Sequence, residues 1–139
     1  ERMYIMTFSL DIKEFAEKVD KNIDDVGRTV AIDLFSAIVK QSPVDTGRFR
    51  NNWNPSINAP DLSTIETTDK SGQKAIAAIV NTAKAFNFSS EGTIFLSNNL
   101  PYAQRLEYGW SKQAPSGMVR LNIARFQSAI NKAIQSLPK

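Results

Sequence analysis

The chain has 139 residues, of which 42% are hydrophobic, and this is enough for one domain with its own core but leaves little for a second. It contains neither cysteine nor histidine, which excludes disulfides, thiolate nucleophiles, Cys/His zinc sites and Ser–His–Asp triads. The net charge of +3, from 17 basic and 14 acidic residues, permits contact with nucleic acid without indicating it. No apolar run approaches the roughly 20 residues of a membrane span, so we expect no membrane partner. Nothing near the start joins a basic segment to an apolar stretch and a small-residue cleavage site, so we expect no secretion signal.

Residues 11–40 are predicted to form one long amphipathic helix, begun by a capping box of Asp11 and Glu14 and ended by Pro43. Gly27 interrupts the pattern, which predicts a kink or a close packing contact there. At 1.5 Å per residue the helix would be roughly 45 Å long, which favours contact with a neighbouring subunit. The apolar residues that recur at helical spacing are Ile12, Phe15, Val19, Ile23, Val26, Val30, Leu34 and Ile38.

The middle of the chain is expected to contain a small sheet. Residues 49–57 are predicted to be extended and residues 58–73 to form a mobile loop, because residues 42–74 are rich in Asn, Ser, Thr, Pro and Gly. The short apolar run at 74–81 favours a buried strand, with one turn of helix at 82–88. Residues 93–97 read as a second strand between Gly92 and Asn98.

Two helices are predicted near the end of the chain. Pro101 would begin a short helix that ends at Tyr108, with Gly109 as its C-terminal cap. Apolar residues from Val119 to Leu137 follow a helical spacing. The expected fold is therefore α+β, with a long N-terminal helix, a small antiparallel or mixed sheet, and a short helix and a C-terminal helix packed on it. Residues 11–139 would form one domain behind an N-terminal extension at 1–10.

Asp45-Thr46-Gly47 matches the active-site tripeptide of aspartic proteases, in which two carboxylates share a proton and activate water. Here a long helix precedes the tripeptide and Arg48 follows it, and an arginine beside the dyad would favour two ionised carboxylates. We prefer a turn in which Asp45 accepts hydrogen bonds from backbone amides and Gly47 supplies a positive φ.

The segment Pro101-Tyr-Ala-Gln-Arg-Leu-Glu-Tyr-Gly109 contains Tyr102, Arg105, Glu107 and Tyr108. One carboxylate without a partner is a weak sign of acid–base chemistry, so we interpret the segment as an aromatic-anchored short helix. We expect Glu107 to pair with Arg48 or Arg50 and tie the first turn to this helix.

Basic and aromatic residues alternate at Arg48, Phe49, Arg50 and Trp53, and again at Tyr108, Trp110 and Lys112. Such a pattern can bind a single strand of nucleic acid by stacking, and this gives an alternative function through Arg48, Arg50, Trp53 and Lys112. The same residue types are enriched at protein–protein interfaces. The low net charge favours the interface.

The order of these motifs resembles the neck and tail-completion proteins of tailed bacteriophages, the family akin to the minor tail protein Z of phage lambda. The resemblance covers roughly residues 11–137 and is carried by an ordered pair of motifs. Asp45, Thr46, Gly47 and Arg48 match the first motif. Phe49 stands where leucine is commoner. The second motif is matched by Tyr102, Ala103, Glu107, Tyr108 and Gly109.

The resemblance implies a structural, non-enzymatic protein without cofactors or metals. It would be located in the virion at the head–tail junction, after synthesis in the bacterial cytoplasm. It would form a homo-oligomer, with a ring of six subunits as the expected form. Its other partners would be tail-terminator, tail-tube or connector proteins, with DNA close by in the channel.

Overall fold

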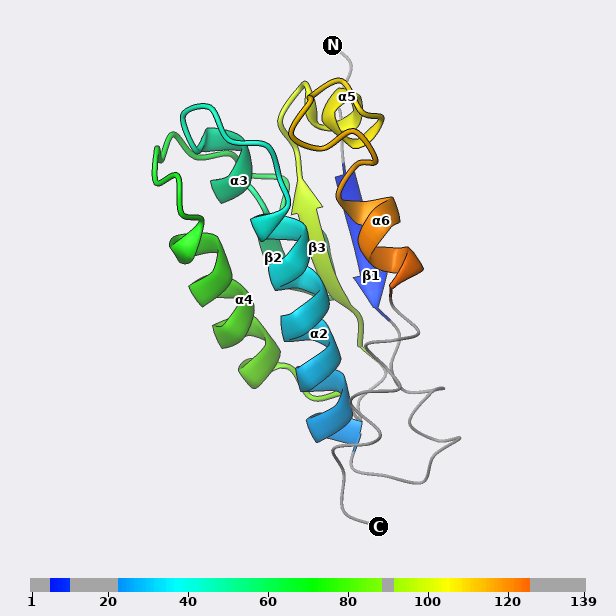
Figure 1. Cartoon of the computed structure of the whole chain (residues 1–139). Coiled ribbons are helices and arrows are strands. Elements are labelled where there is room, and N and C mark those ends of the chain that lie inside the picture. Colours follow the sequence, from blue (N-terminus) through cyan, green and yellow to red (C-terminus); the bar gives the residue numbers. More distant parts are fainter. Residues whose placement is uncertain (1–5, 11–22, 89–91, 126–139) are drawn as a thin grey trace.

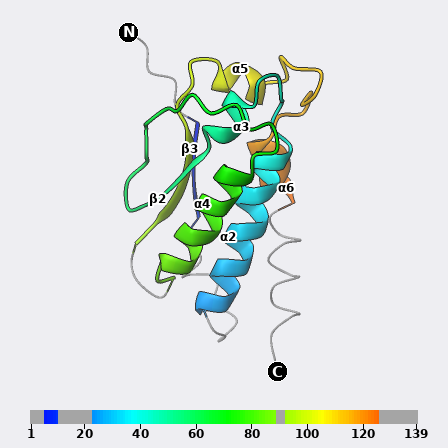
Figure 2. The same cartoon turned by 90° about the vertical axis from the view of Figure 1, so that its left-hand side faces the viewer.

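The computed structural model describes residues 6–10, 23–88 and 92–125, which form an α+β fold of a small sheet and surrounding helices (Figure 1). Figure 1 and Figure 2 show α2 and α4 lying side by side over one face of the sheet. The predicted fold class is confirmed. In chain order the elements are β1 (Met6–Leu10), α2 (Ile23–Lys40), α3 (Arg48–Asn51), β2 (Asn54–Ile57), α4 (Gln73–Ala85), β3 (Ile94–Asn98), α5 (Ala103–Glu107) and α6 (Val119–Ala124).

The sheet has three antiparallel strands in the order β1-β3-β2. The strand predicted at 93–97 is confirmed as the central strand β3, in which Ile94 and Leu96 are fully buried. Met6–Leu10 falls within the N-terminal extension predicted at 1–10, but this segment pairs along β3, with Met6 opposite Asn98 and Leu10 opposite Ile94. The sheet therefore draws on the beginning of the chain as well as on its middle.

Helix α2 confirms the periodicity predicted for 23–40, because Val26, Val30, Leu34 and Ile38 are buried on its inner face. The predicted part at 11–22, with its capping box, lies outside the described residues. The close contact expected at Gly27 is present: a Cβ atom at this position would overlap the ring of Phe88. The missing side chain lets that ring lie against the helix backbone.

The strand predicted at 74–81 is wrong, because these residues belong to helix α4 (Gln73–Ala85). Ala75, Ile79 and Ala83 recur every four residues and are buried, so one face of the helix packs against α2 and the sheet. A short apolar run is compatible with either structure, and its helix-favouring alanines together with tertiary packing decide for the helix.

Three shorter segments refine the prediction. The segment expected to be extended at 49–57 begins with the helical turn α3 and becomes a strand only at Asn54. The helix expected to begin at Pro101 begins at Ala103. The last helix is described from Val119 to Ala124, and its continuation lies outside the described residues. Its predicted apolar stripe is only partly right, since Asn122 is buried and Ile123 is 40% exposed.

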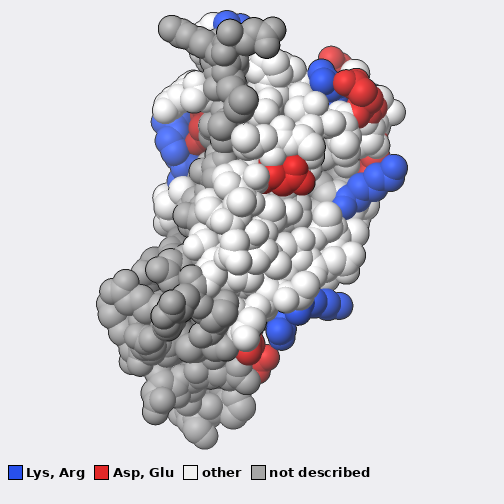
Figure 3. All heavy atoms as spheres, turned by 180° about the vertical axis from the view of Figure 1, so that it is seen from behind, with Lys and Arg blue, Asp and Glu red and all other residues white. Residues whose placement is uncertain are grey.

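The surface on the sheet side, seen in Figure 3, consists mainly of uncharged residues, with most charged side chains toward its edges. None of the helices that the structure describes combines the length and apolar character that crossing a membrane requires.

Candidate functional site

The two motifs singled out in the sequence meet at one end of the molecule, where Figure 1 shows α3 and α5. The ring of Phe49 lies 5.9 Å from the ring of Tyr102, measured between centroids. The side-chain amide of Asn98 donates to the carbonyl of Phe49 at 3.0 Å. Because Phe49 also packs edge-to-face on buried Trp53, at 5.8 Å, the first motif is anchored in the core and the second lies against it.

The turn at Asp45-Thr46-Gly47 has the positive φ that was predicted for Gly47, 94°. The side-chain acceptor differs from the prediction: the hydroxyl of Thr46, rather than the carboxylate of Asp45, accepts the amide of Arg48 at 3.2 Å. Asp45 is exposed to solvent. A Cβ atom at Gly47 would lie 2.7 Å from the backbone of Asp69, so glycine lets two stretches of main chain touch here.

Arg48, Arg50 and Trp53 are committed to contacts within the chain. Arg48 forms an ion pair with Glu66 at 3.0 Å. The indole N–H of Trp53, which is 1% exposed, donates to the hydroxyl of Ser42 at 2.8 Å. Arg50 donates to the carbonyls of Lys40, Ser42 and Lys70, and burial lowers the pKa of its guanidinium.

These contacts bear on the nucleic-acid alternative. The buried indole of Trp53 is not available to stack on a base, whereas Lys112 is exposed in the segment between α5 and α6. The four residues proposed for that alternative therefore do not form one exposed surface.

The loop at 58–72 is held by side-chain amides of asparagine. Asn52 forms two hydrogen bonds with the main chain of Ile65, accepting its amide at 2.8 Å and donating to its carbonyl at 2.9 Å. Asn51, Asn54 and Asn99 donate to further carbonyls of the loop, those of Asp69, Ser63 and Leu62. The mobility predicted for this loop stays a prediction, and the asparagines that shape it were not predicted as site residues.

The predicted pairing of Glu107 with Arg48 or Arg50 is wrong. The Glu107 carboxylate is buried and accepts the amides of Met118, Val119 and Arg120, each at 2.8 Å, and the Nε of Arg120 at 3.1 Å. These amides belong to the first turn of α6, whose donors have no partner within the helix. Glu107 therefore joins α5 to α6, and its partner arginine comes from α6 rather than from the first motif.

The end of α5 confirms the cap predicted at Gly109, whose φ is 88°. The amide of Gly109 donates to the carbonyl of Leu106, and the amide of Trp110 donates to the carbonyl of Arg105, both at 3.2 Å. This is the Schellman arrangement that closes a helix with glycine in the left-handed region. It turns the chain outward, so that Tyr108 and Trp110 are 66% and 71% exposed.

Each exposed ring is covered on one side by an arginine. The guanidinium of Arg105 lies 5.0 Å from the centroid of the Trp110 ring, and that of Arg120 lies 4.7 Å from the centroid of the Tyr108 ring. Such cation–π pairs hold the arginine side chains in place at the surface. The result is a fixed, basic and aromatic surface beside the second motif.

A cavity of about 360 Å³ lies between the two motifs. Gln113 closes one side of it, because its side-chain amide accepts from the Val44 amide at 2.9 Å and donates to the Val44 carbonyl at 3.0 Å. Gln113 was not predicted as a site residue, because it lies in an irregular segment and carries no local signal. The cavity is lined by Pro43, Val44, Asp45, Thr46, Gly47, Phe49, Tyr102, Leu106, Ser111 and Gln113.

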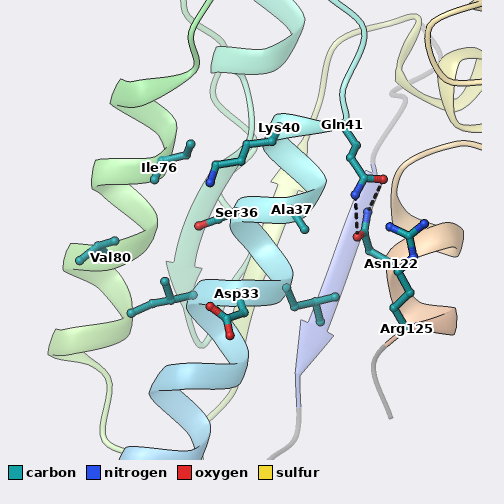
Figure 4. Close-up of a pocket in the computed structure, with 11 residues that line it drawn as sticks. Asp33, Ser36, Ala37, Lys40, Gln41, Ile76, Val80, Asn122 and Arg125 are labelled. Carbon is teal, nitrogen blue, oxygen red and sulfur yellow. Dashed lines mark hydrogen bonds between the residues drawn. The ribbon is translucent and has the colours of Figure 1, made fainter. Parts of the chain in front are cut away.

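A larger groove of about 660 Å³ runs over α2 between α4 and α6 (Figure 4). On the α6 side, the groove is lined by the side-chain amides of Gln41 and Asn122, which hydrogen-bond to each other at 3.3 and 3.4 Å. Ile76 and Val80 form its other wall. The buried hydroxyl of Ser36 lies at this groove without a hydrogen-bond partner in the part of the chain that the structure describes.

The described residues bring no three acidic, cysteine or histidine side chains into one group that could hold a metal ion. The features that stand out at this end of the molecule are a packed junction of two motifs and exposed aromatic residues.

No protein-family model matches the chain, no curated protein matches it, and no solved structure matches it.

Proposed function

We propose that this chain is a structural protein of a tailed bacteriophage or prophage, located in the virion at the head–tail junction. In this role it completes the tail or joins it to the head connector, and it acts as a homo-oligomer without enzymatic activity or cofactor. Its neighbours are tail-terminator, tail-tube or connector proteins.

The observation that carries this proposal is the ordered pair of motifs, Asp45-Thr46-Gly47-Arg48 and Tyr102-Ala103 with Glu107-Tyr108-Gly109. Their order along the chain resembles the neck and tail-completion family. Their contact through Phe49 and Tyr102 supports treating them as one unit. The α+β fold is compatible with this proposal, but a fold alone never specifies a function.

The proposal also agrees with the surface chemistry. Tyr, Trp and Arg are the residue types most enriched where proteins bind each other tightly. Tyr108, Trp110 and Arg105 are exposed together beside the second motif. A protein that works by contacting its neighbours needs such residues on its surface.

The test is an in-frame deletion of the gene in the phage or prophage that encodes it, followed by electron microscopy of induced lysates. We expect DNA-filled heads and separate tails, and a return of joined virions when the wild-type gene is supplied from a plasmid. A chain with Trp110→Ala and Arg105→Ala, both exposed, should complement less well than a chain with Lys74→Ala and Lys84→Ala on α4. Normal infectious virions from the deletion strain would refute the proposal.

A further inference from the structure

The outer face of α2 lies at the bottom of the larger groove, between α4 and α6 (Figure 4). Four of its residues line the groove at the positions i, i+3, i+4 and i+7 of one helix: Asp33, Ser36, Ala37 and Lys40. Residues at this spacing share one face of a helix. It is the spacing by which one helix contacts a second helix laid along it.

The middle of this stripe consists of short side chains, and one of them lacks a hydrogen-bond partner. Ser36 is 8% exposed, and its buried hydroxyl has no partner in the part of the chain that the structure describes. Figure 4 shows this hydroxyl directed toward the α4 side of the groove. A buried polar group without a partner is costly, so this position favours a bound group that supplies an acceptor.

The two ends of the stripe carry opposite charge. Asp33 and Lys40 are both exposed, and neither forms an ion pair within the described ranges of the chain. They lie seven residues apart, roughly 10 Å along the helix, which is too far for them to pair with each other. Arg125 adds a second exposed cation on the α6 side. The groove therefore has short side chains in its centre and unpaired charges at fixed places around them.

We infer that this groove docks an amphipathic helix of a partner protein. The apolar stripe of that helix would pack on Ile32, Ala37, Ile76 and Val80. An acidic residue of the partner would face Lys40, and a basic residue would face Asp33. The inference rests on the proposed function only in taking the partner to be a neighbouring virion protein, and it names the kind of segment that this neighbour presents.

The shape of the groove favours a partner helix over a second copy of the chain. Helix α2 is recessed between α4 and α6, so the α2 helices of two copies would be held apart by the walls of both grooves. Two hollow faces placed together leave empty space, whereas stable interfaces pack as densely as protein interiors. A single helix that projects from another protein fills such a groove.

The first test is an NMR titration of the full chain with a stapled helical peptide of about 14 residues, roughly 21 Å long. The peptide carries leucines on one face, flanked by one lysine and one glutamate two helical turns apart. We expect saturable shifts of the backbone amides of Ser36, Ala37, Ile76 and Val80. A peptide of the same composition with its leucines spread around the helix should not produce them. If the first peptide moves none of these amides at millimolar concentration, the inference is wrong.

A reversal of charge tests the pairing at Lys40. Lys40→Glu should weaken binding of the peptide about tenfold, and a second peptide with lysine in place of its glutamate should regain that affinity for the variant. Lys84→Glu, on α4 and outside the groove, is the matched control and should bind both peptides as wild type does. Circular dichroism checks that each variant is folded. Equal affinity of wild type and Lys40→Glu for the first peptide would contradict the inference.

The floor of the groove separates a partner helix from a second copy. Ala37→Arg places a long side chain there, so it should abolish binding of the peptide without changing the oligomeric state in sedimentation velocity. If wild type forms a dimer that Ala37→Arg dissociates, the groove belongs to a second copy and the inference is overturned.

The outcomes also distinguish this inference from the proposed function. Peptide binding in the groove together with normal virions from the deletion strain would refute the proposed function alone. Unjoined heads and tails together with a groove that binds no peptide would refute only the docking of a helix.

Discussion

The side-chain amide of Gln113 forms two hydrogen bonds with the main chain of Val44, a residue 69 positions earlier in the chain. This pairing resembles one rung of a β-ladder, with a side chain in the place of a strand. It joins the segment after α5 to the turn before α3, across the cavity between the two motifs. The junction of the motifs therefore depends on this polar contact as well as on the aromatic contact of Phe49 with Tyr102.

Replacing Gln113 with alanine should loosen the junction without unfolding the protein. Both hydrogen bonds are exposed, so their loss should lower the free energy of unfolding by only about 1 kcal/mol. Hydrogen exchange at the Val44 amide should become faster. Gln104→Ala, an exposed glutamine on α5, is the matched control. Unchanged protection of Val44 in Gln113→Ala would show that the clamp does not form in solution.

Glu107→Ala should be the most destabilising change in the second motif. It would leave the amides of Met118, Val119 and Arg120 without their acceptor, in a position where water cannot easily replace it. We expect a loss of about 3 kcal/mol in the free energy of unfolding, measured by urea denaturation.

The control for Glu107→Ala is Glu66→Ala, because the Glu66 side chain is 82% exposed and its ion pair with Arg48 is at the surface. That change should cost less than about 1 kcal/mol. Arg120→Ala should also cost much less than Glu107→Ala, since the carboxylate would keep its three backbone donors. Equal effects of Glu107→Ala and Glu66→Ala would contradict this account of the Glu107 carboxylate.

Gly27→Ala should destabilise the protein although alanine is the better helix former. Helix propensity favours alanine by about 1 kcal/mol, but the new methyl group would overlap the ring of Phe88. Overlap in a packed core costs about 1–3 kcal/mol. Thermal unfolding should show a lower midpoint for the variant.

A second background tests the cause of that effect. In a Phe88→Ala chain the ring is gone, so adding Gly27→Ala should raise stability rather than lower it. If Gly27→Ala lowers the midpoint equally in both backgrounds, the contact with Phe88 is not the reason for the glycine.

Asp69 should titrate below its ordinary pKa of 3.8. The hydroxyl of Ser71 donates to its carboxylate at 2.6 Å and the amide of Ser71 donates at 3.0 Å, and both bonds favour the ionised form. Because the pKa is depressed in the folded chain, this contribution to stability is present above pH 3.8 and is lost as the pH falls through the folded pKa.

The measurement is a titration of the Asp69 side-chain carboxyl carbon by NMR. Ser71→Ala should bring the pKa back toward 3.8, whereas Ser116→Ala, an exposed serine outside this turn, should not move it. An Asp69 pKa at or above 3.8 in the wild-type chain would refute the role of Ser71.

The features that were predicted correctly are local ones. The spacing of Val26, Val30, Leu34 and Ile38 predicted the described part of α2 because a helix repeats every 3.6 residues. Gly47 and Gly109 were predicted at turns because few other residues adopt a positive φ. Helical spacing and the preference of glycine for turns can both be recognised from a few neighbouring residues, without knowledge of the tertiary structure.

The wrong predictions concern segments or partners that local signals leave ambiguous. The run at 74–81 was too short to show a period, and the packing of Ala75 and Ile79 in the core decides its helical structure. The sequence contains several arginines that could pair with Glu107, and it does not show which of them lies close to its carboxylate. The chain turns after α5 at Gly109, and α6 then places Arg120 beside Glu107.

The sequence by itself therefore determined the α+β class, the main helix, the central strand and the residues of the two turn motifs, because short-range periodicity and backbone sterics act within a few residues. Only the tertiary structure decided which side chains meet. Gln113 reaches Val44, asparagines hold the loop at 58–72, and Tyr108 and Trp110 remain exposed beside their arginines. These contacts depend on the path of the chain in space, and that path is set by the burial of the whole core rather than by any segment alone.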